Sequence, residues 1–378
     1  MDSMPFAFGR TASEAHFTDR DEERARLRRN FGSGVNTIIV SPRRWGKSSL
    51  VARVAQEVTA SEHDIKVCLI DAFNVRDEAG FYAQLVRGVL QATSTKWEEW
   101  VQVAKQFLGH LRPTISVGDA IASSITFDLD WEQAQQTPDE ILDLAENIAA
   151  ERDIRLVVCV DEFQAIADFK ESLAFQRKLR SHWQAHQHVC YCLYGSKRHM
   201  LIDIFTDPSM PFYRFGDVMT LGKIGNADWG DFIVDRFAVT GKTIPVQVAR
   251  DLAALVGNHS YYVQQLALQA WFRTKKTCTP AIVDAAISEL ADQLGLGFVS
   301  LAGSLSAKQL SFLHAVMDGE TELSSQLVLT RYRLGTSANV VRMRQTLAAK
   351  EIIDVTPSGV EILDPMFAFW LRRDCFGR

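Results

Sequence analysis

The first part of the chain alternates short, continuous apolar runs with stretches whose apolar residues recur at helical spacing. The runs lie at residues 37–40, 66–71, 156–160, 189–194 and 217–221. Such runs are typical of strands that are buried on both faces of a parallel sheet. The helical stretches between them, such as Glu78 to Thr93, predict covering helices. The pattern therefore favours an α/β core over residues 1–222.

An insertion at about 96–136 interrupts this alternation. Its first part predicts a helix with Trp97, Trp100 and Phe107 on one face, and two alternating segments at 114–118 and 124–129 then predict a small hairpin. The aromatic face has two interpretations, a docking surface for a partner or a face packed on the sheet. Packing on the sheet is favoured, because aromatic residues at helical spacing usually belong to a core.

After residue 221 the pattern becomes helical. Amphipathic segments at 227–239, 245–256, 260–274 and 279–293 predict a helical lid, and Leu294-Gly295-Leu296-Gly297 is expected to be a hinge or linker. From Ser306 onward, three helical segments and a hairpin follow, which is the pattern of a winged helix. The predicted domains are a core at 1–222, a lid at 223–297 and a winged-helix domain at 298–378.

Composition narrows the class of protein. With 378 residues, 47% apolar and 23% charged, the chain is typical of a soluble globular protein of two or three domains. A net charge of −5 gives no general attraction to nucleic acid, although a local basic face is compatible with it. Six cysteines without C-x-x-C pairs, no signal-peptide pattern and no run of membrane-spanning length predict a reduced, cytoplasmic protein without membrane association.

The segment between the first predicted strand and the helix after it carries candidate chemistry. It reads Ser41-Pro42-Arg43-Arg44-Trp45-Gly46-Lys47-Ser48-Ser49. Gly-Lys-Ser between a strand and a helix is the pattern of a phosphate-binding loop, whose backbone N–H groups surround the phosphates. Lys47 is expected to reach the outer phosphates and the Ser48 hydroxyl to ligate Mg²⁺. The usual pattern G-x-x-x-x-G-K-[ST] has glycine where this chain has Ser41.

A predicted strand that is followed by two acidic residues supplies the second half of the expected nucleotide site. The run at 156–160 is followed directly by Asp161 and Glu162. Asp161, at the carboxyl end of the strand, is placed to hold Mg²⁺, and Glu162 is placed to orient and polarise the attacking water. Acids that merely end a strand in solvent are the alternative, but the two motifs together favour a nucleotide site.

This order of parts resembles the AAA+-related archaeal and bacterial ATPases, which are close to the STAND NTPases and the origin-recognition ATPases. The resemblance spans nearly the whole chain. It rests on the phosphate-loop motif above, on Val160-Asp161-Glu162-Phe163-Gln164 and on four further segments, Phe17-Thr18-Asp19-Arg20, Tyr194-Gly195-Ser196, Gly257-Asn258-His259-Ser260-Tyr261-Tyr262 and Asp364–Arg372. It implies a P-loop core with strand order 5-1-4-3-2, a helical lid and a C-terminal winged helix.

The resemblance also implies roles for residues outside the two motifs. Ser196 would sense the γ-phosphate, with a simple strand-end cap as the alternative. Arg214 would stabilise phosphate charge in cis or on a neighbouring subunit, with a surface ion pair as the alternative. His259 stands where many such ATPases have an arginine, so it substitutes for that sensor or the sensor is absent. Phe17 and Arg20 would pack around adenine, with a simple core role as the alternative for Phe17.

The best-supported activity is binding and slow hydrolysis of Mg-ATP; ATP rather than GTP follows from the resemblance and from the lack of an Asn-Lys-x-Asp motif. Coupling of nucleotide state to a separate effector or regulatory protein is one hypothesis, and a homo-oligomer is compatible with it. A DNA-binding ATPase that uses its winged helix is the second hypothesis, with Arg342 and Arg344 as candidate phosphate contacts, Lys350 beyond them and Arg331 and Arg333 just upstream. A helix face that these residues only keep solvated is the alternative. A nucleotide-binding scaffold that does not hydrolyse ATP is the third, against which the intact motifs argue.

Overall fold

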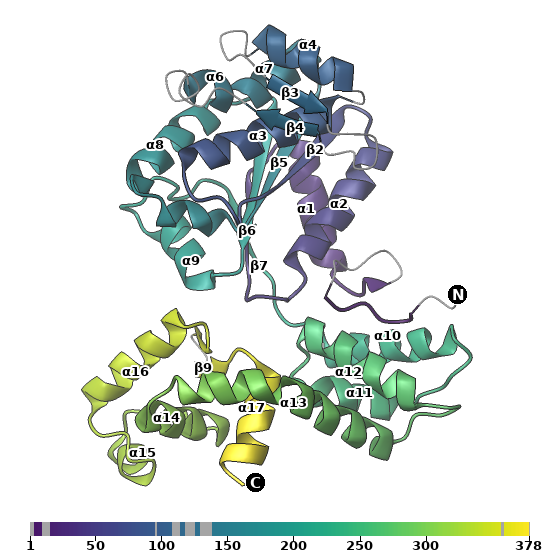
Figure 1. Ribbon diagram of the computed structural model, residues 1–378, viewed down its shortest axis with the longest axis vertical. Coiled ribbons are helices and arrows are strands. Elements are labelled where there is room, and N and C mark those ends of the chain that lie inside the picture. The colour runs from purple at the N-terminus through teal and green to yellow at the C-terminus, as the bar shows by residue number, and fades with distance from the viewer. Residues whose placement is uncertain are drawn as a thin grey trace. The chain divides into compact units, whose positions relative to one another are not determined.

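The computed structural model describes residues 4–9, 16–94, 97–107, 114–117, 125–128, 138–356 and 359–377. It divides into two compact units. The core unit comprises Arg20–Gly222, and the C-terminal unit comprises Lys223–Arg378 together with Met1–Asp19. Figure 1 shows the elements of both units along the chain.

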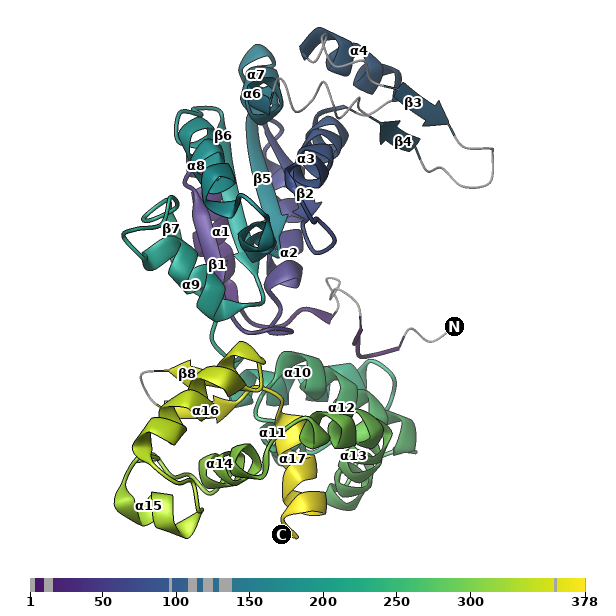
Figure 2. The same cartoon turned by 60° about the vertical axis from the view of Figure 1, so that its left-hand side comes forward.

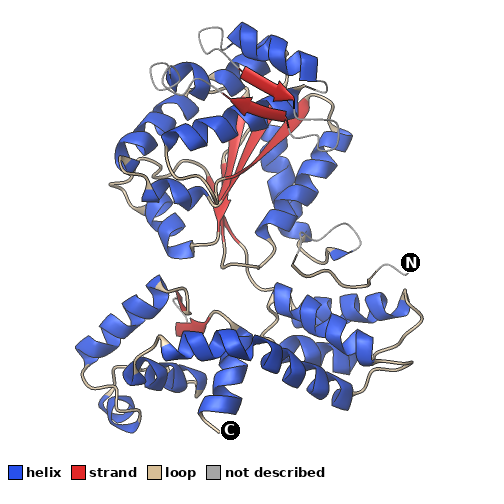
Figure 3. Cartoon of the chain, in the orientation of Figure 1, coloured by secondary structure: helices blue, strands red, loops and turns tan. Residues whose placement is uncertain are grey.

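The core unit is built on a five-stranded parallel sheet, drawn in red in Figure 3. Its order is β2-β5-β6-β1-β7. When these strands are numbered from one to five along the chain, this order is 5-1-4-3-2 read from the other edge, so the expected topology is confirmed. The strands are β1 (Thr37–Val40), β2 (Ile65–Asp71), β5 (Arg155–Asp161), β6 (Val189–Gly195) and β7 (Asp217–Thr220).

Helices cover both faces of this sheet, which is why β1 and β6 are buried along their whole length. α1 (Asp21–Ser33) and α2 (Lys47–Ser61) pack against each other on one face (Figure 1). The other face forms one apolar core with the remaining helices of the unit. These are α3 (Glu78–Thr93), α6 (Pro138–Leu142), α7 (Leu144–Glu151), the short η2 (Phe163–Asp168), α8 (Ser172–Trp183) and α9 (Arg198–Thr206).

The insertion contains the predicted helix and hairpin. α4 (Trp97–Phe107) packs against α3 and α7, and β3 (Thr114–Val117) pairs antiparallel with β4 (Ile125–Asp128) (Figure 2). Val103 is buried, and Trp100 and Phe107 lie partly buried against the apolar core of the unit. The favoured interpretation of this face as packed is therefore confirmed for these residues. The Trp97 side chain and the turn of the hairpin lie outside the described residues.

The C-terminal unit is mainly helical and shares one apolar core. Its helices α14 to α16, followed by the antiparallel pair β8–β9, confirm the predicted winged-helix pattern. Ser306 opens α14 with a capping box to Gln309. The elements are α10 (Asn226–Ala238), α11 (Val246–Leu255), α12 (Ser260–Arg273), α13 (Pro280–Gly303), α14 (Ala307–Met317), α15 (Gln326–Arg331), α16 (Ser337–Ala349), β8 (Ile353–Thr356), β9 (Gly359–Ile362), α17 (Pro365–Trp370) and the π-helical turn η3 (Leu371–Cys375).

The expected linker at 294–297 is wrong, because α13 runs through it without a break. Leu290 and Ala291 before this segment, and Phe298 and Ala302 after it, are all buried in the core of the unit. Their spacing continues one helical face across both glycines. Burial on that face outweighs the cost of about 1 kcal/mol for each glycine in a helix.

The first residues pack differently from the prediction, which counted residues 1–222 as the core. Phe6 is buried in the apolar core of the C-terminal unit, where its ring lies 6.2 Å from that of Phe232 and 5.8 Å from that of Phe237. The backbone N–H of Ala7 donates to Oε1 of Gln264 at 3.2 Å. These contacts explain why residues 4–9 and 16–19 belong to the C-terminal unit.

Candidate nucleotide-binding site

In the loop between β1 and α2, the Lys47 side chain bonds to the backbone of the loop itself. Lys47 is only 5% exposed, and its Nζ donates to the carbonyl oxygens of Ser41 at 3.0 Å and Pro42 at 2.9 Å. The Ser41 hydroxyl lies 3.3 Å from the same Nζ, so the residue that departs from the usual glycine contributes a further acceptor. Gly46 has φ 95°, a left-handed conformation in which glycine is favoured. Arg43 and Arg44 are exposed on the loop.

Ser48 and Asp161 come together although they are far apart in sequence. Ser48 lies in the first turn of α2 and Asp161 ends β5, and the Ser48 Oγ donates to Oδ2 of Asp161 at 2.6 Å. A carboxylate and a hydroxyl oxygen are ligands that suit Mg²⁺. Burial raises the pKa of Asp161, and the neighbouring Glu162 adds to this, while the Ser48 hydroxyl and the Lys47 ammonium oppose it. A cation bound beside Asp161 would compensate for this buried charge.

Glu162 is anchored by the end of the neighbouring strand. Ser196 follows β6, and both its N–H at 3.2 Å and its hydroxyl at 3.0 Å donate to Oε2 of Glu162. The Gln164 amide donates to the same oxygen. The backbone of Glu162 is left-handed, with φ 53°, and its N–H donates to Oδ1 of Asp161 at 2.8 Å. Ser196 is thus placed beside the expected water-orienting residue.

Gln164 belongs to the segment Val160–Gln164 on which the resemblance rests, but no role in the site is predicted for it from the sequence. A polar residue in the otherwise apolar stretch after Glu162 predicts no particular contact. In the structure Gln164 is buried between Glu162 and Gly195, the last residue of β6. Its contacts depend on how β5 and β6 lie side by side, which the sequence pattern does not specify in atomic detail.

Arg20 lies close to the phosphate loop, in contacts with backbone carbonyls. Its guanidinium is buried and donates to the carbonyl oxygen of Gly222 at 2.6 Å and to that of Trp45 at 3.4 Å, while it pairs with Glu23 at 2.8 Å. Arg20 therefore joins the phosphate loop to the last residue of the core unit. Its backbone is left-handed, with φ 76°. Its expected role beside adenine stays a prediction.

Of the remaining residues implied by the resemblance, Arg214 lies in the core unit, and Phe17 and His259 lie in the C-terminal unit. Arg214 is exposed before β7, with its guanidinium carbon 5.0 Å from the centre of the Tyr213 ring. Among the described residues it pairs with no carboxylate, so the alternative of a surface ion pair finds no partner there. Phe17 and His259 belong to the C-terminal unit, where His259 is buried and its ring lies 5.1 Å from that of Tyr262.

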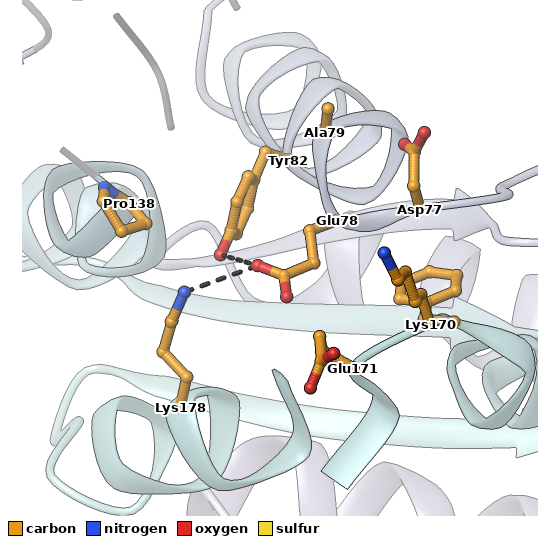
Figure 4. A pocket seen from close by; sticks show the side chains of 9 residues that line it. Asp77, Glu78, Ala79, Tyr82, Pro138, Lys170, Glu171 and Lys178 are labelled. Atoms are coloured by element: carbon orange, nitrogen blue, oxygen red, sulfur yellow. Dashed lines mark hydrogen bonds and ion pairs between the residues drawn. The ribbon is translucent and has the colours of Figure 1, made fainter. Parts of the chain in front are cut away.

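A separate cavity of 380 Å³ opens beside α3 in the core unit (Figure 4). Glu78 accepts hydrogen bonds there from the Tyr82 hydroxyl at 3.3 Å and from Lys178 at 3.4 Å. Burial, together with the nearby Glu78, raises the pKa of Tyr82. The lining contains none of the phosphate-loop residues and is Asp77, Glu78, Ala79, Tyr82, Pro138, Phe169, Lys170, Glu171 and Lys178.

Comparison with protein families agrees with this geometry. Residues 45–168 match the KAP family P-loop domain. The core unit has the fold of a P-loop NTPase domain. Residues 297–373 match a probable winged helix domain. No curated protein matches the chain in sequence.

Solved structures with the same fold superpose on almost the whole chain. The Walker-type ATPase of Pyrococcus abyssi is 18% identical and superposes with a TM-score of 0.68, over 98% of this chain and 100% of that one. The ORC2 protein of Aeropyrum pernix, in its ADPNP–ADP complexes, is 15% identical with a TM-score of 0.56 and the same coverage. The chain thus has the same fold as these two proteins, in line with the fold that the resemblance implied. No helix in the described part of the chain is both long and apolar enough to span a membrane.

Proposed function

We propose that this chain binds and slowly hydrolyses Mg-ATP and couples its nucleotide state to a partner, as a STAND-type switch does. The observation that carries the proposal is the 2.6 Å hydrogen bond between Ser48 and Asp161. It brings the phosphate loop and the strand-end acid to one point, which is what a site for Mg²⁺ and phosphate requires. The match of residues 45–168 to a P-loop family supports the same assignment.

Each residue has a separate task in the proposed mechanism. Lys47 would exchange its bonds to the Ser41 and Pro42 carbonyls for bonds to the outer phosphates, and so neutralise their charge. Ser48 and Asp161 would hold Mg²⁺, which supplies further neutralisation of phosphate charge when bound. Glu162 would orient water for in-line attack on the γ-phosphorus. Phosphoryl transfer depends mainly on such positioning and charge stabilisation.

The nucleotide identity, the partner and the outer site residues complete the proposal. ATP as the nucleotide rests on the resemblance stated above. The proposed partner is a separate effector or regulatory protein, and a homo-oligomer in which Arg214 acts on a neighbouring subunit is compatible with its exposed position. Phe17, Arg20 and His259 are proposed to contribute to the nucleotide pocket, and the cytoplasm is the proposed location.

Mg²⁺-dependent ATP binding tests whether the Ser48–Asp161 pair forms a metal site. Ser48→Ala removes the hydroxyl from the Ser48–Asp161 pair, so we expect the gain in ATP affinity on adding Mg²⁺ to fall at least tenfold. Ser61→Ala is a matched control, because Ser61 lies at the far end of the same helix and bonds to the Glu57 carbonyl there. Isothermal titration with and without Mg²⁺ measures both. Equal Mg²⁺ dependence in wild type and Ser48→Ala would contradict the proposed metal site.

DNA contact by the winged helix is the second candidate function. Arg342 and Arg344 are exposed on α16, and neither pairs with a carboxylate among the described residues. Arg331, in contrast, pairs with Glu320 at 3.0 Å. Unpaired arginines on one helix are suited to contact phosphates of a duplex.

Salt-dependent binding to duplex DNA distinguishes this second function. Replacing Arg342 and Arg344 by alanine would weaken binding and reduce the slope of log affinity against log salt by about one for each phosphate that is no longer neutralised. Arg331→Ala is the control, since its charge is already paired. Wild-type affinity too weak to measure at low salt would exclude DNA contact as a function of this surface.

A further inference from the structure

A buried amide lies beside the carboxylate that is proposed to orient water. Gln164 is 3% exposed, and its Nε2 donates to Oε2 of Glu162. Its own Oε1 is buried without a hydrogen-bond partner among the described residues. A buried polar atom left unpaired costs about 1–3 kcal/mol. An apolar side chain of the same size would avoid that cost, so stability alone does not favour glutamine at this position.

The end of the neighbouring strand leaves room for this amide. A Cβ atom on Gly195 would lie 1.8 Å from Oε1 of Gln164 and 3.2 Å from the Cα of Glu162. Gly195 does not adopt a left-handed conformation, so its backbone angles do not require glycine. The space taken by the Gln164 amide does require it.

The two carboxylate oxygens of Glu162 accept different numbers of hydrogen bonds. Oε2 receives the Gln164 amide and both donors of Ser196, whereas Oε1 receives no hydrogen bond within the described part of the chain. A carboxylate fixed by one oxygen presents the other in a defined direction. Gly195 stands in register with Val40, directly before the phosphate loop, so this anchoring occurs next to that loop.

We propose that Gln164 is a positioning residue for hydrolysis. With Ser196 it fixes Oε2 of Glu162 and leaves Oε1 to orient the attacking water, and glycine at position 195 provides the space that the amide needs. This inference rests on the proposed ATP hydrolysis. It adds a residue that touches neither nucleotide nor water and acts through Glu162.

The main test is Gln164→Met, which keeps a side chain of similar size and removes the donor. Residues that orient a functional group through a hydrogen bond typically contribute 10–100-fold to activity. We therefore expect kcat for ATP to fall about 10–100-fold while KM and ATP affinity change less than about twofold. Gln176→Met is the control, because Gln176 is also a buried glutamine with an unpaired Oε1 but bonds only to Ser172.

A double substitution separates positioning from general damage. Gly195→Ala should lower kcat as Gln164→Ala does. Added to Gln164→Ala it should have a smaller effect than it has in wild type, because the displaced amide is already gone and only the Cβ contact with the Glu162 backbone remains. Gly303→Ala is the glycine control, because a Cβ there meets no atom within 4 Å. If Gln164→Met unfolds the protein, Gln164→Asn is used instead, because its shorter amide does not reach Glu162.

The outcomes distinguish this inference from the function on which it rests. If wild type hydrolyses ATP and Gln164→Met has the same kcat, the positioning role alone is overturned. The same holds if Gln176→Met lowers kcat as much as Gln164→Met does. A fall in kcat on adding Gly195→Ala to Gln164→Ala that is as large as the fall it causes in wild type would overturn the role of the glycine. Wild type that binds Mg-ATP but does not turn it over would overturn the proposed hydrolysis and this inference together.

Discussion

Within the described part of the chain, the buried Arg20 guanidinium pairs with a single carboxylate, that of Glu23. It compensates by donating to the carbonyls of Gly222 and Trp45. A left-handed non-glycine residue is held at a cost of about 1–3 kcal/mol when its surroundings determine it. These contacts account for why Arg20 keeps φ 76°.

Replacing Arg20 therefore has a calculable effect on stability. Arg20→Ala leaves two carbonyls without their donor, and hydrogen bonds to charged groups contribute about 1.5–3 kcal/mol each. We expect the free energy of unfolding of the core unit to fall by about 2–4 kcal/mol, measured by denaturant titration. Arg28→Ala, an exposed arginine on the same helix, is the control and should change it by less than about 0.5 kcal/mol. Equal effects of both substitutions would contradict the assigned contacts.

Under the proposed function, Asp161 makes the stabilisation by Mg²⁺ depend on pH. Its raised pKa means that the folded state favours the protonated acid, so its contribution to stability is present at low pH and lost as pH rises through the folded pKa. Mg²⁺ binds the ionised form and reverses this loss. We expect Mg²⁺ with ATP to raise the melting temperature more at pH 8 than at pH 5.

Asp161→Asn should narrow the difference between the two pH values, and the part that remains reflects the titration of the ATP phosphates themselves. Asp168→Asn, an exposed acid near Lys197, should leave the difference unchanged. Differential scanning fluorimetry at the two pH values measures the effect. A Mg²⁺ effect that persists unaltered in Asp161→Asn would place the metal elsewhere.

At the scale of elements, α13 provides the clearest departure from the sequence pattern. Gly295 and Gly297 suggested a hinge, yet both lie inside one helix of 24 residues. Glycine lowers helix stability because its backbone loses more freedom on folding. The buried face on either side of the glycines holds the helix together.

Gly297→Ala tests whether this segment is helical. Gly297 is exposed, and a Cβ there meets no atom within 4 Å. In a continuous helix the substitution should raise the free energy of unfolding of the C-terminal unit by about 0.5–1 kcal/mol. Gly241→Ala is the contrasting control, since Gly241 has φ 72° and alanine there should destabilise. A loss of stability in Gly297→Ala would favour a hinge.

Most elements were predictable because their signals are local. The run at 156–160 and the helix at Glu78–Thr93 have the expected bounds to within one residue. Lys47, Ser48, Asp161 and Glu162 could be assigned because a strand end and a helix start place them by rule. The contacts of Arg20 were not predictable, since Arg20 and Gly222 are 202 positions apart. Gln164 bonds to Glu162 only two positions away, but that contact depends on the left-handed backbone of Glu162 and on the space beside Gly195, which the sequence pattern does not specify.

At the scale of the whole molecule, the chain passes between its two units twice, after Asp19 and after Gly222. Arg20 follows the first crossing and bonds to the carbonyl of the residue before the second, while it also bonds to Trp45 in the phosphate loop. Under the proposed function, a nucleotide that moves this loop acts on the chain at both crossings.

Hydrogen exchange can detect this coupling. We expect a non-hydrolysable ATP analogue with Mg²⁺ to change amide exchange around residues 19–24 and 220–225 at least threefold in wild type. In Arg20→Lys, which keeps the charge without the planar fork, the change around 220–225 should shrink while that in the phosphate loop remains. An identical pattern in both proteins would show that Arg20 does not link the loop to the second crossing.

The most direct test of the account is ATP turnover by purified protein, with wild type beside Lys47→Ala and Glu162→Gln and with Lys178→Ala as a control lysine outside the loop. We predict slow Mg²⁺-dependent release of phosphate by wild type and Lys178→Ala. We predict loss of ATP binding in Lys47→Ala, and loss of turnover with ATP binding retained in Glu162→Gln. Wild type that binds no ATP, or turnover unaffected by either loop or acid substitution, would contradict the central claim.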